Sequence, residues 1–512
     1  MAEDNSTSTE SSGPLDEVPA AGLRRVRRWC VVIAVGGFLF GFDTGVISGA
    51  LLFIKKDFSL SSFEQGSVVS ILLLGALVGA LSAGRISDPL GRRKALGIQG
   101  VVFLIGTVIA VLATGYWMLL IARLILGLAV GAASATVPIY LSEVAPTAIR
   151  GRMLTLNQLL ITIGILIAYF TNLAFSGFEG WRAMIGVGTI PSLILLAGAL
   201  WFLPESPIWQ LVHGREDEAR RFYVSISDEE TADAVIAEQR KQQEEEKEEN
   251  EKRDAAEAQG SGEDSGERSE EQVDKGWKVL LLSRVRPALI VGLTLAAIQQ
   301  FGGINTIIYY APSIIESTGL TASKAIFYSI AIGAINLIMT IVANRLIDRS
   351  GRRRLLIVSL SAMAVTLGLL GLSFVLGWSP LISLVFMVIY IAAFAIGLGP
   401  IFWTLVGEIF PSDARAHGSG VSTAVNWGSN FFVSLVFLSV ADAIGQGQTF
   451  WIFGVICAFG LWFVGRYVPE TKDREFEEVD AALLRRFRHD PETGEKTKSR
   501  QKASGQKKSG QE

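Results

Sequence analysis

The sequence predicts an all-α membrane protein whose twelve transmembrane helices form two pseudo-symmetric six-helix bundles. Three observations support this prediction. Half of the 512 residues are hydrophobic and only 19% are charged, whereas a soluble domain carries about 25% charge. Apolar runs long enough to cross about 30 Å of hydrocarbon recur along the chain, and one charged motif occurs twice between such runs. Because lipid offers no hydrogen-bond partner to the backbone, each run must be helical.

The expected spans follow from the apolar runs alone. They are 29–52, 65–84, 95–113, 117–141, 153–175, 182–203, 287–311, 324–347, 355–377, 381–406, 419–441 and 449–468. The charged turn R-x-x-D-x-x-G-R-R occupies 85–93 and recurs at 345–353, 260 residues later. Two such turns at equivalent places indicate a duplicated half, and internal repeats of this kind are typical of transporters.

Further pairs of residues support the duplication. Glu143, Pro146 and Arg150 are repeated 265 residues later as Glu408, Pro411 and Arg415, and Pro204-Glu205-Ser206 is repeated as Pro469-Glu470-Thr471. The spacing therefore predicts the domains 1–28 (a disordered N-terminus), 29–209 (first bundle), 210–286 (central loop), 287–470 (second bundle) and 471–512 (tail).

Lys and Arg residues gather in alternate loops, from Arg24 to Arg28, at the duplicated turns and in the tail. Positively charged loops stay inside, so we expect a multi-pass cell-membrane protein with both termini and the central loop in the cytoplasm. Within that loop, short amphipathic helices are expected at 211–224 and 277–286. The acidic stretch 228–275 is interpreted as a solvated linker or a lone charged helix, with a regulatory role as the alternative.

Asp43 and Arg123 are the two charged residues well inside the predicted spans. Such residues are costly in a membrane and usually have a function and a partner. At 1.5 Å per residue, both fall at compatible depths, so we expect them to pair. Burial favours a neutral carboxyl and a nearby arginine favours a carboxylate, so movement of Arg123 would bind and release a proton at Asp43. The alternative is a static pair that only fixes helix packing.

Uncharged polar residues mark a second candidate site. Amides both donate and accept hydrogen bonds, which suits a ligand with many hydroxyl groups, and an indole adds an apolar face with one donor. For any single amide, packing between helices is an equal alternative. Gln299, Gln300 and Asn305 lie near one face of one helix, which favours a ligand site. The set also includes Gln158, Asn336, Asn426, Trp403 and Trp427.

Other classes of protein have little support. Cys30 and Cys457 are isolated, and all three histidines fall in predicted cytoplasmic segments. We find no nucleophile–base pair, metal-ligand cluster or phosphate-binding loop, so we expect no catalytic residues, metal, other cofactor or nucleic-acid partner.

The quoted residues resemble the sugar porter family of the major facilitator superfamily, over roughly 29–475. The resemblance rests on Gly41-Phe42-Asp43-Thr44, the two charged turns, Pro138-Ile139-Tyr140, Pro204-Glu205-Ser206-Pro207, Gln299-Gln300-Phe301-Gly302-Gly303-Ile304-Asn305, Gly399-Pro400-Ile401-Phe402-Trp403 and Pro469-Glu470-Thr471-Lys472.

This resemblance implies a transporter for a monosaccharide or related polyol that works by alternating access in the lipid bilayer, as a monomer. Asp43 with Arg123 favours proton symport; the alternatives are a facilitative uniporter, or a sugar sensor that signals through 228–275 and 485–512. By motif position, the sugar contacts are Gln158, Gln299, Gln300, Asn305, Asn336, Trp403 and Asn426. The extracellular gate is Tyr309 and Tyr310. The cytoplasmic gate is Asp88, Arg92, Glu143, Arg150, Glu205, Asp348, Arg352, Glu408 and Arg415.

Two departures from the family pattern concern the first half. Pro89 and Ile208 stand where basic residues are usual. We therefore expect the N-terminal part of the cytoplasmic gate to be held more loosely than the C-terminal part.

Overall fold

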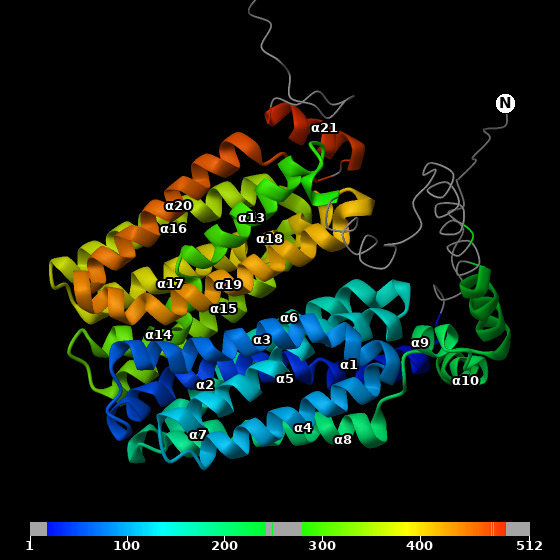
Figure 1. Ribbon diagram of the computed structural model, residues 1–512, viewed down its shortest axis with the longest axis horizontal. Helices are drawn as coiled ribbons and strands as arrows, with labels where there is room; N and C mark the ends of the chain where they lie inside the picture. The colour runs from blue at the N-terminus through cyan, green and yellow to red at the C-terminus, as the bar shows by residue number, and fades with distance from the viewer. Residues whose placement is uncertain (1–17, 242–247, 249–278, 473, 475, 488–512) are drawn as a thin grey trace, which may run out of the picture.

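The computed structural model describes residues 18–241, 248, 279–472, 474 and 476–487. Within these residues, twelve helical spans are long and apolar enough to cross a membrane, as the sequence predicts. The N-terminal helices form one bundle and the C-terminal helices form the other, and the two bundles meet at one end of the molecule and diverge toward the other end (Figure 1). The two bundles are the duplicated halves.

The N-terminal half begins with a span broken after Ile33. Its elements are α1 (Ala20–Ile33), α2 (Val35–Asp57), α3 (Ser62–Leu90), α4 (Arg92–Val111), α5 (Tyr116–Val144), α6 (Thr147–Phe175), η1 (Ser176–Phe178), α7 (Trp181–Gly186), α8 (Thr189–Ala197) and the π-helix η2 (Gly198–Phe202). The short helices α9 (Pro207–Val212) and α10 (Glu216–Ile226) follow at one end of the bundle.

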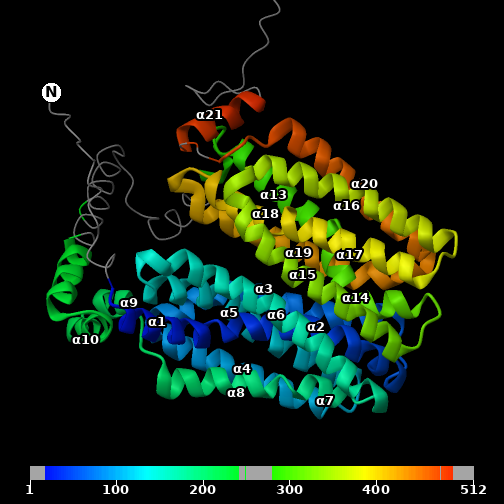
Figure 2. The ribbon, with the colours of Figure 1, turned by 180° about the vertical axis from the view of Figure 1, so that it is seen from behind.

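The C-terminal half contains two broken spans. Its elements are η3 (Val279–Leu281), α13 (Arg286–Phe301), α14 (Ile304–Glu316), α15 (Ala322–Ser350), α16 (Arg352–Val375), α17 (Pro380–Ile396), α18 (Leu398–Glu408), α19 (Ser412–Ile444), α20 (Gln446–Tyr467) and α21 (Phe476–Arg486). Helices α9, α10 and α21 lie at the same end of the molecule in both views (Figures 1 and 2). We call this end the basic face, because it carries both charged turns, and the other end the opposite face.

The chain is more helical outside the membrane than the sequence predicts. Helix α1 begins at Ala20, within the range expected to be disordered, because Val26 on its inner side is fully buried. Residues 229–241 are helical and bury Ala232, Val235 and Ile236. The interpretation of 228–275 as a solvated linker or a lone charged helix is therefore wrong for 229–241, and 242–247 and 249–278 lie outside the described residues.

The segments near the second bundle also differ from the prediction. The helix expected over 277–286 is reduced to the single turn η3 among its described residues. The tail contributes the helix α21, which buries Val479, Leu483 and Leu484. Residues 1–17 and 488–512 lie outside the described part of the chain.

The two halves meet closely toward the opposite face. There Lys55 at the end of α2 forms an ion pair with Glu316 at the end of α14, 2.6 Å apart. Ser62 bonds to Asp442, and the Tyr169 hydroxyl donates to the Ile308 carbonyl at 2.9 Å. Halfway along, the rings of Phe40 and Trp427 lie 5.8 Å apart. The conformation is thus closed on the opposite face.

Candidate functional site

Asp43 owes its position to a glycine stripe in α2. A Cβ atom on Gly37, Gly41 or Gly45 would come within 3 Å of atoms of α6, so the two helices can pack closely only because these side chains are absent. Residues four apart share one helix face. Asp43 lies two residues after Gly41, on the side that faces away from α6.

On that side Asp43 meets Arg123 of α5. Arg123 Nη1 donates to both carboxylate oxygens, at 2.8 and 2.7 Å, and its Nε donates to the Val68 carbonyl of α3 at 3.1 Å. Both charged side chains are only 3% exposed. The pair is a charge-assisted contact inside the membrane-spanning part of the N-terminal half. The expected contact is present, and its role in proton coupling stays a prediction.

Four of the predicted sugar contacts form one amide network in the C-terminal half. Gln300 Nε2 donates to Gln299 Oε1 at 3.3 Å and to Asn426 Oδ1 at 3.1 Å. Asn426 Nδ2 returns a bond to Gln299 Oε1 at 2.6 Å. Asn305 Nδ2 donates to Gln300 Oε1 at 2.7 Å. The network joins α13, α14 and α19.

Broken helices place this network. Between α13 and α14, Gly303 has φ of +92°, and a Cβ there would lie 2.5 Å from the Phe453 ring. Only glycine fits both conditions without strain. Beside the second break, between α17 and α18, the Leu398 and Gly399 carbonyls in the first turn of α18 accept from Gln299 Nε2 at 3.1 and 3.0 Å. Discontinuous spans with free backbone groups are typical of transporter binding sites.

The other three predicted sugar contacts lie apart from the network. Gln158 in α6 is exposed, and Trp403 in α18 is 49% exposed. Asn336 in α15 is buried and accepts from Thr340 only through its backbone carbonyl. Their role as sugar contacts stays a prediction.

The two predicted gate tyrosines are both buried in α14. Tyr310 donates to the Ser434 carbonyl at 2.7 Å and stacks on Phe437 at 5.3 Å. Tyr309 faces Thr44 and Asn430, close to the Asp43–Arg123 pair. Tyr309 therefore connects the C-terminal half to the charged pair of the N-terminal half, on the side where the halves are closed.

At the basic face, an N-terminal ion-pair cluster consists of Asp88, Arg92, Glu143 and Glu205. Arg92 Nε and Nη2 contact Glu143 at 3.0 and 3.1 Å, and Nη1 contacts Asp88 at 2.9 Å. Glu205 Oε1 accepts from the Arg93 amide at 3.0 Å. It thereby caps the N-terminus of α4, where a carboxylate also complements the helix dipole.

The C-terminal ion-pair cluster repeats this design with Arg352, Glu408 and Glu470. Glu470 Oε1 accepts from the Arg352 and Arg353 amides at 2.7 and 3.4 Å. Arg352 reaches Glu408 through one contact at 3.1 Å, while the other Glu408 oxygen accepts from Thr471. The Arg–Glu pair is thus bidentate in the N-terminal half and single in the C-terminal half, which is the reverse of the looser N-terminal gate that we expected.

Arg150 and Arg415 do not join these clusters among the described contacts. Arg150 forms no ion pair with a described residue, and its Nε is buried without a hydrogen-bond partner. It lies instead near Tyr223 of α10, where burial raises the tyrosine pKa to about 12 and Arg150 opposes that shift. Arg415 Nε donates to the Phe410 carbonyl at 3.3 Å. The side chain of Asp348 lies outside the described part of the structure.

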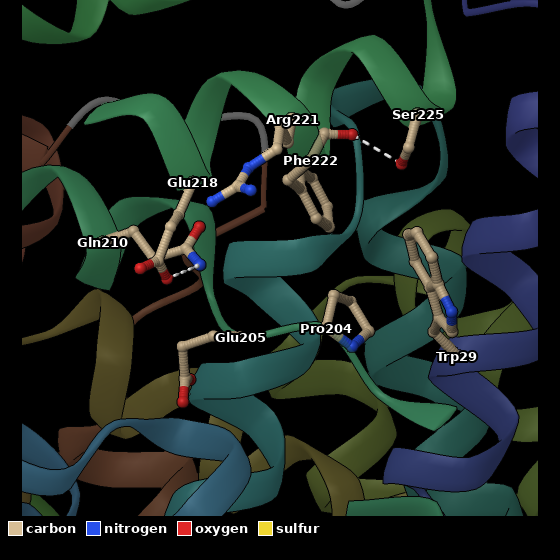
Figure 3. A pocket seen from close by; sticks show the side chains of 8 residues that line it. All are labelled: Trp29, Pro204, Glu205, Gln210, Glu218, Arg221, Phe222 and Ser225. Atoms are coloured by element: carbon tan, nitrogen blue, oxygen red, sulfur yellow. Dashed lines mark hydrogen bonds between the residues drawn. The ribbon is translucent and has the colours of Figure 1, made fainter. Parts of the chain in front are cut away.

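A pocket of about 310 Å³ lies beside the N-terminal cluster, between α10 and the start of the first span (Figure 3). The rings of Trp29 and Phe222, 5.5 Å apart, form one side, and Glu205 lies across from them. Gln210 Nε2 donates to Glu218 at 3.2 Å at the remaining edge. The helices outside the membrane therefore cover the Glu205 cap.

Sequence reasoning missed several residues that hold the site together. Glu470 belongs to a repeated motif, so its equivalence to Glu205 could have assigned it to the gate. Nothing in the sequence pairs Lys55 with Glu316, 261 residues away, nor predicts that Ser359 Oγ accepts from the Leu398 amide at 3.1 Å at the second break.

Comparison with known proteins extends these observations. The family model for sugar (and other) transporters matches residues 29–483. The D-xylose transporter of Levilactobacillus brevis is 40% identical, with 88% of this chain and 94% of that protein covered. The galactose-proton symporter of Escherichia coli K12 is 36% identical, covering 89% and 94%. The inward-open structure of the E. coli xylose transporter XylE superposes with a TM-score of 0.73 at 28% identity, covering 89% of this chain and 99% of that one.

Proposed function

Because this chain belongs to the sugar transporter family of the major facilitator superfamily, we propose that it carries a monosaccharide or related polyol into the cell together with a proton. It is a transporter rather than an enzyme. Its relatives include a D-xylose transporter and a galactose-proton symporter. Hexoses, pentoses and their polyols are therefore the substrate class.

The amide network is the observation that carries the proposal. Gln299, Gln300 and Asn426 are almost fully buried, yet they bond mainly to one another and to backbone carbonyls beside the break between α17 and α18. Sugar hydroxyl groups can replace such bonds one for one, because each hydroxyl both donates and accepts. Gln158, Asn336 and Trp403 would complete the site when the halves close around the sugar.

Proton coupling is assigned to Asp43 and Arg123. A buried carboxylate held by an arginine is stable only while the arginine stays in place. Tyr309 links this pair to α14, whose first residues carry Asn305 of the amide network. A shift of α14 on sugar binding would therefore move both sites together.

Alternating access is assigned to the two faces. By the distribution of Lys and Arg, the basic face lies in the cytoplasm, so the present conformation is open to the inside. The superposition on the inward-open structure supports this assignment. When the basic face closes, Arg150 and Arg415 would join the two ion-pair clusters across the interface, and the buried Arg150 Nε would gain a partner.

Reconstitution into proteoliposomes tests this function. Uptake of radiolabelled xylose, galactose, glucose, arabinose and a polyol would be measured with and without an imposed pH gradient. We expect at least one sugar to accumulate above its external concentration, and a protonophore to abolish that accumulation. Equilibration without accumulation would leave a facilitative uniporter, and no uptake of any sugar would overturn the proposal.

A further inference from the structure

A groove on the outer side of the N-terminal bundle is not used by the transport pathway. It has a volume of about 400 Å³ and is lined by Arg27, Arg28, Val31, Val32 and Phe202. We call it the α1–η2 groove. Its apolar residues Val31 and Phe202 remain 48% and 46% exposed. In a chain of twelve membrane spans, an exposed apolar groove of this kind faces lipid.

The geometry of two helices opens this groove. Gly198, the first residue of the π-helix η2, lies so near α1 that a Cβ there would be 2.4 Å from Val32 Cγ1. From this contact the wider π-helix turns outward and exposes Phe202. π-helical turns are rare and frequently mark functional sites. The groove is therefore built by a specific close contact rather than by loose packing.

The arginines lie at the membrane boundary end of the groove. Phe202 is the last residue of its span, and Arg27 lies one helical turn before Val31 on the same face of α1. Arg27 and Arg28 are exposed, and neither side chain forms an ion pair or hydrogen bond with a described residue. By contrast, the neighbouring Arg25 donates to the Ser225 carbonyl of α10 at 2.5 Å.

We propose that the α1–η2 groove binds one anionic phospholipid, with its phosphate on Arg27 and Arg28 and an acyl chain along Val31, Val32 and Phe202. Guanidinium groups bind phosphate oxygens through paired charge-assisted hydrogen bonds. Basic pockets between transmembrane helices on the cytoplasmic side attract anionic headgroups. The two arginines favour an anionic headgroup, and the apolar groove favours a ligand with a hydrocarbon chain.

Native mass spectrometry of the full-length protein in mild detergent tests the proposal, with phosphatidylglycerol and phosphatidylcholine of identical chains offered at equal concentration. We expect one phosphatidylglycerol to be retained in preference to phosphatidylcholine. The double variant Arg27→Ala/Arg28→Ala should weaken that retention about tenfold or more. This readout does not depend on sugar transport, so its failure leaves the proposed function untouched.

Two further variants separate a built site from general attraction to a positive surface. Arg474→Ala/Arg485→Ala removes the same charge from exposed positions on the same face and should retain phosphatidylglycerol like the wild type. Val31→Trp keeps both arginines but fills the groove, and should weaken retention. Equal loss in the Arg474/Arg485 control, full retention in Val31→Trp, or no lipid preference in the wild type would each overturn the proposal.

Discussion

The two halves share a scaffold but differ in the chemistry at equivalent places. Gly41-Phe42-Asp43-Thr44 in the first half corresponds to Gly303-Ile304-Asn305-Thr306 in the second. Asp43 bonds to Arg123, whereas its counterpart Asn305 bonds to Gln300. Val388 lies 265 residues after Arg123, the spacing of Glu143 and Glu408. At these equivalent places, the first half has the buried charge pair, whereas the second half has the uncharged residues Asn305 and Val388.

This difference agrees with our proposal that the two halves share a duplicated scaffold and have diverged toward two tasks, proton coupling and sugar binding. A charge pair responds to protons, while an amide network responds to hydroxyl groups. The charge pair lies in the N-terminal half and the amide network in the C-terminal half, and α14 contacts α2 near Tyr309. A change in one half should therefore disturb one task and leave the other measurable.

The largest expected effect comes from breaking the charge pair. Arg123→Ala leaves Asp43 buried without a partner, which costs about 3–5 kcal/mol. Val388→Ala, at the equivalent place in the other half, should cost about 1 kcal/mol, since a half-buried side chain loses only part of the roughly 0.8 kcal/mol per CH₂. Thermal unfolding in detergent measures both. The double variant Asp43→Asn/Arg123→Ala should recover stability relative to Arg123→Ala; a further loss would argue against the pair.

Removing the centre of the amide network should affect sugar binding alone. Gln299→Ala removes bonds to Asn426, Gln300 and two carbonyls, and unsatisfied partners cost about 1–3 kcal/mol. We expect sugar affinity to fall about tenfold or more in a binding titration. Gln99→Ala is the matched control, because Gln99 is a buried amide bonded to Thr136 within the N-terminal half. Similar losses of affinity in both variants would point to a general packing defect.

Removing the central arginine of each ion-pair cluster should have smaller effects on stability, and the effects should differ between the two halves. Arg92→Ala removes a bidentate contact and a second carboxylate, and should cost about 2 kcal/mol, against about 1 kcal/mol for Arg352→Ala. Thermal unfolding compares their stabilities. Spin labels at Gly151→Cys and Gly420→Cys, where a Cβ meets open space, report the separation of the halves at the basic face. If Arg92→Ala and Arg352→Ala lower the free energy of unfolding equally, the bidentate contact of Arg92 stabilises the protein no more than the single contact of Arg352.

The smallest effect is expected at the opposite face. Lys55→Ala breaks the ion pair with Glu316. Both side chains of this pair are partly exposed, so its loss should cost about 0.5–1 kcal/mol of stabilisation of the closed opposite face. Weaker closure of the opposite face should shift the population away from the conformation open at the basic face by a few-fold, which the same labels at the basic face report as a smaller separation. The swapped pair Lys55→Glu/Glu316→Lys should restore the wild-type distribution. Failure of the swap while each single variant shifts the distribution would mean that other contacts hold this face.

The sequence predicts the features that depend on local pattern. It does not predict contacts that form only when segments far apart in the chain pack together. The twelve spans and the Asp43–Arg123 contact follow from hydrophobic length and from the cost of charge in lipid. The breaks beside Gly303 and Gly397 do not, because each lies inside a single predicted span, 287–311 or 381–406. Likewise, residues 229–241 read as polar, yet their few apolar side chains share one face and become buried.

In the proposed mechanism, the N-terminal charge pair couples proton movement to sugar movement, and the amide network binds the sugar. The variant Asp43→Asn, reconstituted beside the wild type, tests it most directly, with Asp57→Asn, an exposed carboxylate of the same helix, as the control. We predict that Asp43→Asn loses accumulation driven by a pH gradient and keeps sugar exchange at equilibrium, while Asp57→Asn keeps both. Accumulation that persists in Asp43→Asn would show that Asp43 does not couple proton movement to sugar movement.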